Sequence, residues 1–186
     1  MMHSRYLISL SSFYLVILSS SHPVILSSFH SFILSSCYLV ILSSTQDAQM
    51  EKPTSAPGSY ILTLQSEVNR TIQVGRLGLL QLQPGFYLYV GSALGPGGVA
   101  ARVAHHQRVS ARPHWHIDYL RQHTALINVF CRHDPVRREH AWAHQLSHRN
   151  GLTIPLRGFG SSDCTCRSHL FYTPLMPQIG QLLNLL

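Results

Sequence analysis

The chain has 186 residues, enough for one domain of ordinary size with additional segments. It carries 14 Lys and Arg residues against 7 Asp and Glu residues, and the net charge of +7 favours a polyanionic partner such as nucleic acid. Three of the 4 cysteines, Cys131, Cys164 and Cys166, lie in the globular part of the chain. An odd number there argues against a disulfide-stapled scaffold and indicates reduced thiols in the cytoplasm.

The first 49 residues are unlike the rest of the chain. They contain almost no charge, and Ile-Leu-Ser-Ser recurs every eight residues, at 17–20, 25–28, 33–36 and 41–44. A repeat of eight matches neither the 3.6-residue period of a helix nor the single apolar run of a signal peptide. We therefore predict that residues 1–49 are a low-complexity extension outside the fold, upstream of a plausible start at Met50. A membrane anchor is the alternative, because the run is long and uncharged.

After a polar lead-in at residues 50–57, short β-branched and aromatic segments separated by turn residues predict strands. The expected strands are 60–64, 71–74, 86–90, 125–131 and 169–172. Longer segments predict helices at 99–109, 116–121 and 136–149, the last beginning with Asp134 as N-cap and Pro135 as its first residue. Strands joined by turns, with helices inserted later, predict an α/β fold in which a small mixed sheet is flanked by helices.

Two tripeptides, Gly58-Ser59-Tyr60 and Tyr89-Val90-Gly91, fall on predicted strands. Arg102 and His106 follow on a basic helix, and Glu139 lies on a later one. This order resembles the GIY-YIG nuclease superfamily. Three longer strings, at 84–95, 114–120 and 158–166, resemble its Uri-type branch, whose domains are sometimes attached to endonuclease III.

The resemblance covers residues 58–173, leaving 174–186 as a C-terminal tail. It implies a single domain with a mainly antiparallel three-stranded central sheet. It also implies a divalent-metal-dependent endonuclease that hydrolyses phosphodiester bonds in DNA, with a role in DNA repair or processing alongside other repair proteins. A nucleic-acid-binding module of the same fold without catalysis is the alternative. Residues 71–83 lie between the two tripeptides and separate them further than in typical members.

Glu139 is the predicted metal ligand. It shares a helix face with Trp142, Ala143 and Leu146, where an unpaired carboxylate is costly and needs a cation. The resemblance implies Mg²⁺ or Mn²⁺. The alternative is an ion pair with Arg102 or Arg137.

Tyr60, Tyr89, Arg102 and His106 are the predicted catalytic residues. Arg102 and His106 are four residues apart and so face the same way on a helix. The resemblance implies that Arg102 contacts the scissile phosphate, that His106 lies near the attacking or leaving oxygen, and that a tyrosine holds or deprotonates the water. The alternative is a surface basic stripe on the helix and ordinary sheet aromatics.

Residues around the site are expected to support it. The predicted nucleic-acid contacts are Arg108, Arg112, His114 and His116. Gly91 and Asp163 are expected to lie next to the catalytic side chains and to help position them without reacting themselves.

Cys164, Cys166 and His169 resemble part of a zinc site. Their C-x-C spacing is short, however, and a fourth ligand has to come from elsewhere, such as His114 or His116. We therefore favour a structural core without zinc at these residues.

Overall fold

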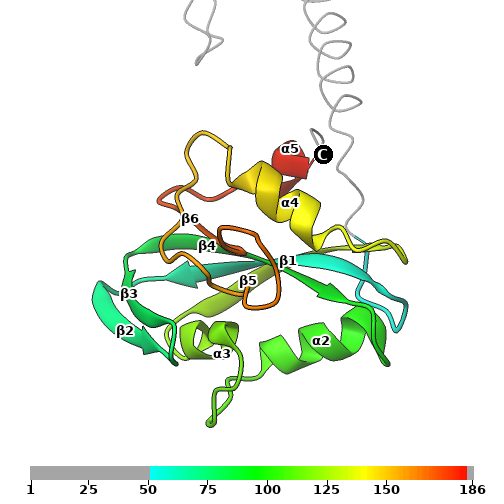
Figure 1. Cartoon of the computed structure of the whole chain (residues 1–186), viewed down its shortest axis with the longest axis horizontal. Coiled ribbons are helices and arrows are strands. Elements are labelled where there is room, and N and C mark those ends of the chain that lie inside the picture. Colours follow the sequence, from blue (N-terminus) through cyan, green and yellow to red (C-terminus); the bar gives the residue numbers. More distant parts are fainter. Residues whose placement is uncertain (1–50, 184–186) are drawn as a thin grey trace, which may run out of the picture. The chain divides into compact units, whose positions relative to one another are not determined.

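A computed structural model of the chain describes residues 51–183 (Figure 1). The predictions for residues 1–49, including the membrane anchor, concern a segment outside the described residues. Within 51–183, no helix is both long enough and apolar enough to cross a membrane.

The central sheet has four strands in the order β5-β1-β4-β6. They are β1 (Gly58–Ser66), β4 (Gly85–Ala93), β5 (Ala125–His133) and β6 (Leu170–Thr173). Strand β1 pairs antiparallel with β4 on one side and β5 on the other, and β6 pairs antiparallel with β4. The predicted α/β fold class is confirmed. The expectation of three central strands is wrong, because β6, although only four residues long, buries Leu170 and Phe171 completely beside β4.

Helices cover both faces of this sheet (Figure 1). Helices α2 (Gly98–Gln107) and α3 (His116–Arg121) lie on one face, and α4 (Glu139–Leu146) and α5 (Ile179–Leu183) lie on the other. Strand β1 therefore buries Tyr60 and Leu62 in the cluster under α2 and α3, and Ile61 in the cluster under α4. Burial on both faces explains why this strand reads as a nearly continuous apolar run.

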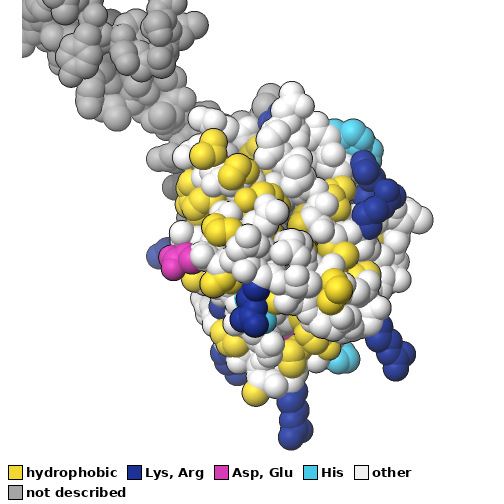
Figure 2. Space-filling model, turned by 90° about the vertical axis from the view of Figure 1, so that its left-hand side faces the viewer, with side chains coloured by type: hydrophobic (Ala, Val, Ile, Leu, Met, Phe, Trp, Pro, Cys, Tyr) yellow, Lys and Arg dark blue, Asp and Glu magenta, His cyan; other side chains and the backbone are white. Residues whose placement is uncertain are grey.

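The 71–83 insertion forms a separate two-stranded hairpin of β2 (Arg70–Val74) and β3 (Gly78–Leu82). Alternate residues face inwards, so Ile72, Val74, Leu80 and Leu82 are buried, and β2 packs against α3. Figure 2 views this end of the molecule and shows Lys and Arg side chains projecting from a surface with little acidic area. The insertion therefore adds to the core at one end of the sheet and does not interrupt the pairing of the two tripeptide strands.

Helix α4 begins at Glu139, three residues later than predicted. Asp134 does not cap it. Its Oδ1 accepts the backbone N–H of Val136, and its Oδ2 pairs with the guanidinium of Arg138. These contacts hold 134–138 in a turn, and the Arg138 N–H donates to the Ser59 hydroxyl on β1. Glu139 consequently sits in the first turn of α4, where the helix dipole favours a negative charge.

Segments outside residues 58–173 take part in the fold. The lead-in satisfies free N–H groups at the start of α2, because Ala56 O accepts from Val99 and Thr54 O accepts from Ala100. At the other end, Ile179 of α5 is buried in the cluster under α4. The segment 174–183, expected as a tail, therefore packs on the domain.

We predict that Gly98→Ala lowers the free energy of unfolding by more than the cost of placing a non-glycine residue at positive φ. Gly98 has a φ of 53°, and a Cβ there overlaps the carbonyl groups of Ser55 and Ala56. Positive φ costs a non-glycine residue about 1–2 kcal/mol, and the overlap adds roughly 1 kcal/mol or more. Urea denaturation measures the loss.

Gly151→Ala is the matched control, since Gly151 has a φ of 83° but nothing lies within 4 Å of an added Cβ. Its free energy of unfolding should fall only by the cost of the positive φ. Equal losses for the two variants would contradict the capping of α2 by residues 54–56.

Candidate active site

One polar hollow of about 290 Å³ brings the predicted catalytic residues together. Strands β1 and β4, helix α2, the start of α4 and the 158–169 loop all contribute to its walls. The predicted residues that line it are Tyr60, Tyr89, Gly91, Arg102, His106, Glu139 and Asp163. It is also lined by Ser92, Leu94, Gly95, Trp115, Arg137 and Gly160, which the sequence did not single out for this site.

Tyr60 and His106 form the innermost pair. The Tyr60 hydroxyl lies 2.8 Å from Nε2 of His106, and both side chains are about 2% exposed. Tyr60 pairs with Gly91 across the sheet, and a Cβ on Gly91 would lie 2.5 Å from the Tyr60 Cζ and Oη atoms. The glycine of the second tripeptide is therefore required so that the tyrosine of the first can lie against the neighbouring strand.

Burial keeps these groups neutral. It lowers the pKa of His106 to about 4, with a further contribution from His105. It raises the pKa of both Tyr60 and Tyr89 well above the ordinary value of a phenol, and neighbouring charge on Glu139 adds to both shifts. At neutral pH the hollow therefore contains an uncharged imidazole and two uncharged phenols.

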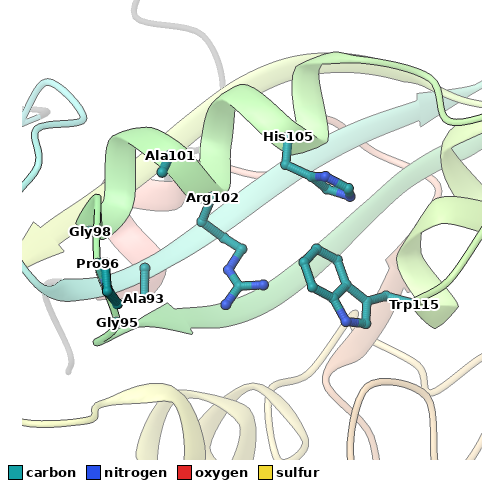
Figure 3. Close-up of a pocket in the computed structure, with 8 residues that line it drawn as sticks. All are labelled: Ala93, Gly95, Pro96, Gly98, Ala101, Arg102, His105 and Trp115. Carbon is teal, nitrogen blue, oxygen red and sulfur yellow. The ribbon is translucent and has the colours of Figure 1, made fainter.

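Arg102 stacks on Trp115, as Figure 3 shows from the side of a second, adjoining hollow of about 220 Å³. Its guanidinium carbon lies 4.5 Å from the indole centroid, a cation–π distance. Asp118 fixes Trp115 by accepting the backbone N–H groups of His114 and Trp115 at the start of α3. Arg102 is thus oriented by an aromatic surface, and its N–H groups have no hydrogen-bond or ion-pair partner within residues 51–183, so they can donate to a ligand.

Glu139 is held by two neighbours. The Ser92 hydroxyl donates to Oε2 at 2.5 Å, and Nδ1 of His169 lies 3.1 Å from Oε1. Burial raises the pKa of Glu139, but His169 and the Ser92 hydrogen bond outweigh it and the pKa falls below its ordinary value. Among residues 51–183, His169 is its ion-pair partner, so the structure does not show the alternative pairing with Arg102 or Arg137.

The residues predicted to contact nucleic acid fall into two groups. Arg108, Arg112 and His114 are exposed on the loop between α2 and α3, which carries Trp115 to the hollow. His116 is different, because its Nδ1 accepts the backbone N–H of Gly160 and ties α3 to the opposite loop. The contacts of the first three with nucleic acid stay a prediction.

The residues present fit the divalent-metal site, with an ionised carboxylate as ligand, that the resemblance implies. Mg²⁺ uses few protein carboxylates and keeps several waters. Glu139 is ionised at the wall of a hollow with room for such waters, and Asp163 is exposed on the same wall. A second group, His105, His106 and Asp118, also brings ligand atoms together. There, however, the Asp118 oxygens are already bonded to His105 and to backbone N–H groups.

Comparison with known proteins places the chain in a family. The family model described as "Domain of unknown function DUF123" matches residues 59–185. This match covers more than half of the chain, so the protein belongs to that family. It extends from β1 through α5, in agreement with the packing of Ile179 on the domain. No curated protein and no solved structure matches the chain.

We predict that His106 makes stability depend on pH. The unfolded chain takes up a proton near the ordinary pKa of 6.5, whereas His106 in the fold stays neutral down to about pH 4. Below pH 6.5 the unfolded state therefore binds more protons than the folded state. The contribution of His106 to the free energy of unfolding is complete above pH 6.5 and is lost as the pH falls towards 4. Between pH 7 and pH 5 the loss should be about 2 kcal/mol.

His106→Gln should remove this part of the pH dependence, as measured by urea denaturation at both pH values. His144→Gln, on the exposed side of α4, is the control and should follow the wild type. If His106→Gln loses as much stability on acidification as the wild type, His106 is not the buried neutral group described here.

Proposed function

We propose that the protein is a divalent-metal-dependent endonuclease of the GIY-YIG type that hydrolyses phosphodiester bonds in DNA. One observation carries the proposal. A buried Tyr60–His106 pair, a stacked Arg102 and an ionised Glu139 line the same polar hollow although they come from three different elements, β1, α2 and α4. Phosphodiester hydrolysis requires a proton acceptor, positive charge at the phosphate and a positioned water, and these residue types supply all three.

Tyr60 and His106 are proposed to accept the proton of the attacking water. A phenol whose pKa is raised is a poor base by itself. The neutral His106 ring, 2.8 Å away, can take the Tyr60 proton at Nε2 while the Tyr60 oxygen takes the proton of the water. The pair then acts as a relay that ends on the His106 imidazole. Burial lowers the pKa of this ring, and the neighbouring charge of Asp118 partly offsets that effect.

Arg102 is proposed to bind the scissile phosphate. Its stack on Trp115 fixes the plane of the guanidinium, and no residue of the described part of the chain bonds to its N–H edge. A planar fork of N–H groups matches two phosphate oxygens. Arg137 lines the same hollow and adds positive charge. Mg²⁺ or Mn²⁺ held by Glu139 would supply further positive charge opposite the non-bridging oxygens.

The alternative function is a module that binds nucleic acid without cutting it. The net charge of +7 and the exposed Arg108 and Arg112 support both functions equally. The buried pair and the held carboxylate distinguish them, since binding to the phosphate backbone needs neither group. Incubation with plasmid and branched DNA, with Mg²⁺ or Mn²⁺ and with chelator, tests the proposal directly.

We predict that Glu139→Gln reduces Mg²⁺-dependent cleavage by at least roughly 100-fold. Gln is close to Glu in size and its oxygen can still accept from Ser92, but it cannot hold the cation. Because the Gln oxygen can also accept from Nδ1–H of His169, and no arginine pairs with Glu139 among the described residues, DNA affinity and melting temperature should change little. Cleavage, binding and melting are measured on the same preparation.

Glu67→Gln is the matched control, since Glu67 is exposed in the turn between β1 and β2 and does not line the hollow. It should cleave like the wild type. Full cleavage by a folded Glu139→Gln protein would rule out the metal role, and DNA binding without cleavage by the wild type under all metal conditions would favour the binding module.

We also predict that DNA binding weakens steeply with salt and that Arg108 and Arg112 account for part of the slope. Each neutralised phosphate contributes roughly −0.9 to the slope of log K against log salt on duplex DNA. Replacing both arginines with Ser should make the slope shallower by about 2 without lowering stability, because both are exposed.

Arg149→Ser, in the segment that follows α4, is the control for loss of charge alone, because Arg149 does not line the hollow. A wild-type binding constant that does not vary with salt would contradict the polyanion argument. An unchanged slope in the double variant would show that the α2–α3 loop does not touch DNA.

A further inference from the structure

Four side chains that can bind a soft or borderline metal ion lie close together next to Glu139. Cys164, Cys166 and His169 come from the loop before β6, and His140 is the residue after Glu139 on α4. One ligand atom from each of the four lies within 4.8 Å of all the others. No residue of this group lines the hollow of the candidate active site.

The distances fit a tetrahedral zinc ion. Zn–N bonds of ~2.1 Å and Zn–S bonds of ~2.3 Å put tetrahedral ligand atoms ~3.4–3.8 Å apart. Nδ1 of His140 lies 3.4 Å from Sγ of Cys166, and Nε2 of His169 lies 3.4 Å from Sγ of Cys164. The remaining pairs of ligand atoms lie within 4.8 Å of each other and would move closer together around the ion.

Two arguments from the sequence stood against zinc, the missing fourth ligand and the short C-x-C spacing, and the structure answers both. The missing fourth ligand is His140, and neither His114 nor His116 is in the group. The short C-x-C spacing is accommodated because 161–169 is a compact loop. Gly158 N–H donates to Arg167 O, and Cys164 N–H donates to Ser161 O.

A second observation points to the same site. His169 is 1% exposed, and its Nδ1 lies 3.1 Å from Oε1 of Glu139 while its Nε2 lies 3.4 Å from Sγ of Cys164. An imidazole bound to metal through Nε2 keeps its proton on Nδ1 and directs it to a carboxylate, an arrangement common at zinc sites. Metal binding therefore explains why this buried ring lies between two thiols and a carboxylate.

We propose that His140, Cys164, Cys166 and His169 bind one zinc ion. The ion cross-links the first turn of α4 to the 161–169 loop, which carries Asp163 on the wall of the hollow. It also fixes the His169 ring beside Glu139. A hollow of about 490 Å³ lined by His140 and Cys166 opens this side of the group to solvent and gives the ion a route of approach.

Zinc binding does not depend on the proposed nuclease function, whereas its positioning effect on Glu139 rests on that function. Two thiolates and two imidazoles select a soft or borderline cation over Mg²⁺. Zinc and Mg²⁺ would therefore occupy separate sites. His169 would lie between them and act as a positioning residue for Glu139.

The test uses the full chain, purified with reduced thiols, stripped with chelator and titrated with Zn²⁺ or Co²⁺. We expect about one zinc per chain by elemental analysis and a thiolate-to-cobalt charge-transfer band that excess Mg²⁺ does not remove. Stripping should lower the melting temperature by roughly 5 °C or more, and Zn²⁺ should restore it. A folded wild type with no such band and no zinc-dependent melting would overturn the proposal.

Variants then assign the ligands. Cys164→Ser and Cys166→Ser should lose the band, while Cys131→Ser, a buried free cysteine outside the group, should keep it. His140→Asn, at a half-buried position, should weaken cobalt binding at least roughly 10-fold and serves if the cysteine variants do not fold. A band unchanged in the folded Cys164, Cys166 and His140 variants would overturn the assignment.

Glu139→Gln separates this proposal from the nuclease. It should abolish cleavage but keep the cobalt band, because Glu139 is not a zinc ligand. If the wild type binds zinc but never cuts DNA, the zinc site stands and the nuclease fails. If the zinc-stripped protein in Mg²⁺ cuts as fast as the loaded one, the positioning role of His169 is wrong.

Discussion

The nine-residue antiparallel pairing of β1 with β4 determines where the groups of the candidate site lie. It puts Tyr60 opposite Gly91, and the absence of a side chain on Gly91 lets the phenol ring lie against the neighbouring strand. A shift of one residue in this register would turn Tyr60 to the other face of the sheet, away from His106. The hydroxyl of Ser92, on the same strand as Gly91, then reaches Glu139 on the α4 side.

The two faces of the sheet contribute different chemistry to one hollow. Helix α2 supplies His106 and Arg102 from one face, and the start of α4 supplies Glu139 from the other. Burial keeps His106 neutral, whereas the Arg102 guanidinium lies over the Trp115 ring at the edge of the hollow. The charged side chains of the hollow are therefore few: Arg102 and Arg137, with Glu139 and the exposed Asp163.

The 158–169 loop connects the hollow to the Cys/His group. A Cβ on Gly160 would lie only 3.0 Å from the Tyr89 ring, and the Gly160 N–H donates to His116. His169 lies between Glu139 and Cys164. The loop has no regular secondary structure of its own, so its shape depends on backbone hydrogen bonds such as His169 N–H to Phe159 O. A cation cross-link at this position would add to these hydrogen bonds, which is the usual benefit of a structural zinc ion.

The sequence alone determined the local elements and the pairs of residues that share a face. The predicted bounds of α3 agree with the structure, and Arg102 and His106 face the same hollow because four residues make about one helical turn. Only the tertiary structure decided the long-range relations. Strand β6 joined the central sheet, Asp134 bonded to Arg138 and did not cap α4, and His140 met two cysteines 24 and 26 residues away. Periodicity reports which way a side chain faces within its own element, but it contains no information about which distant element packs against that face.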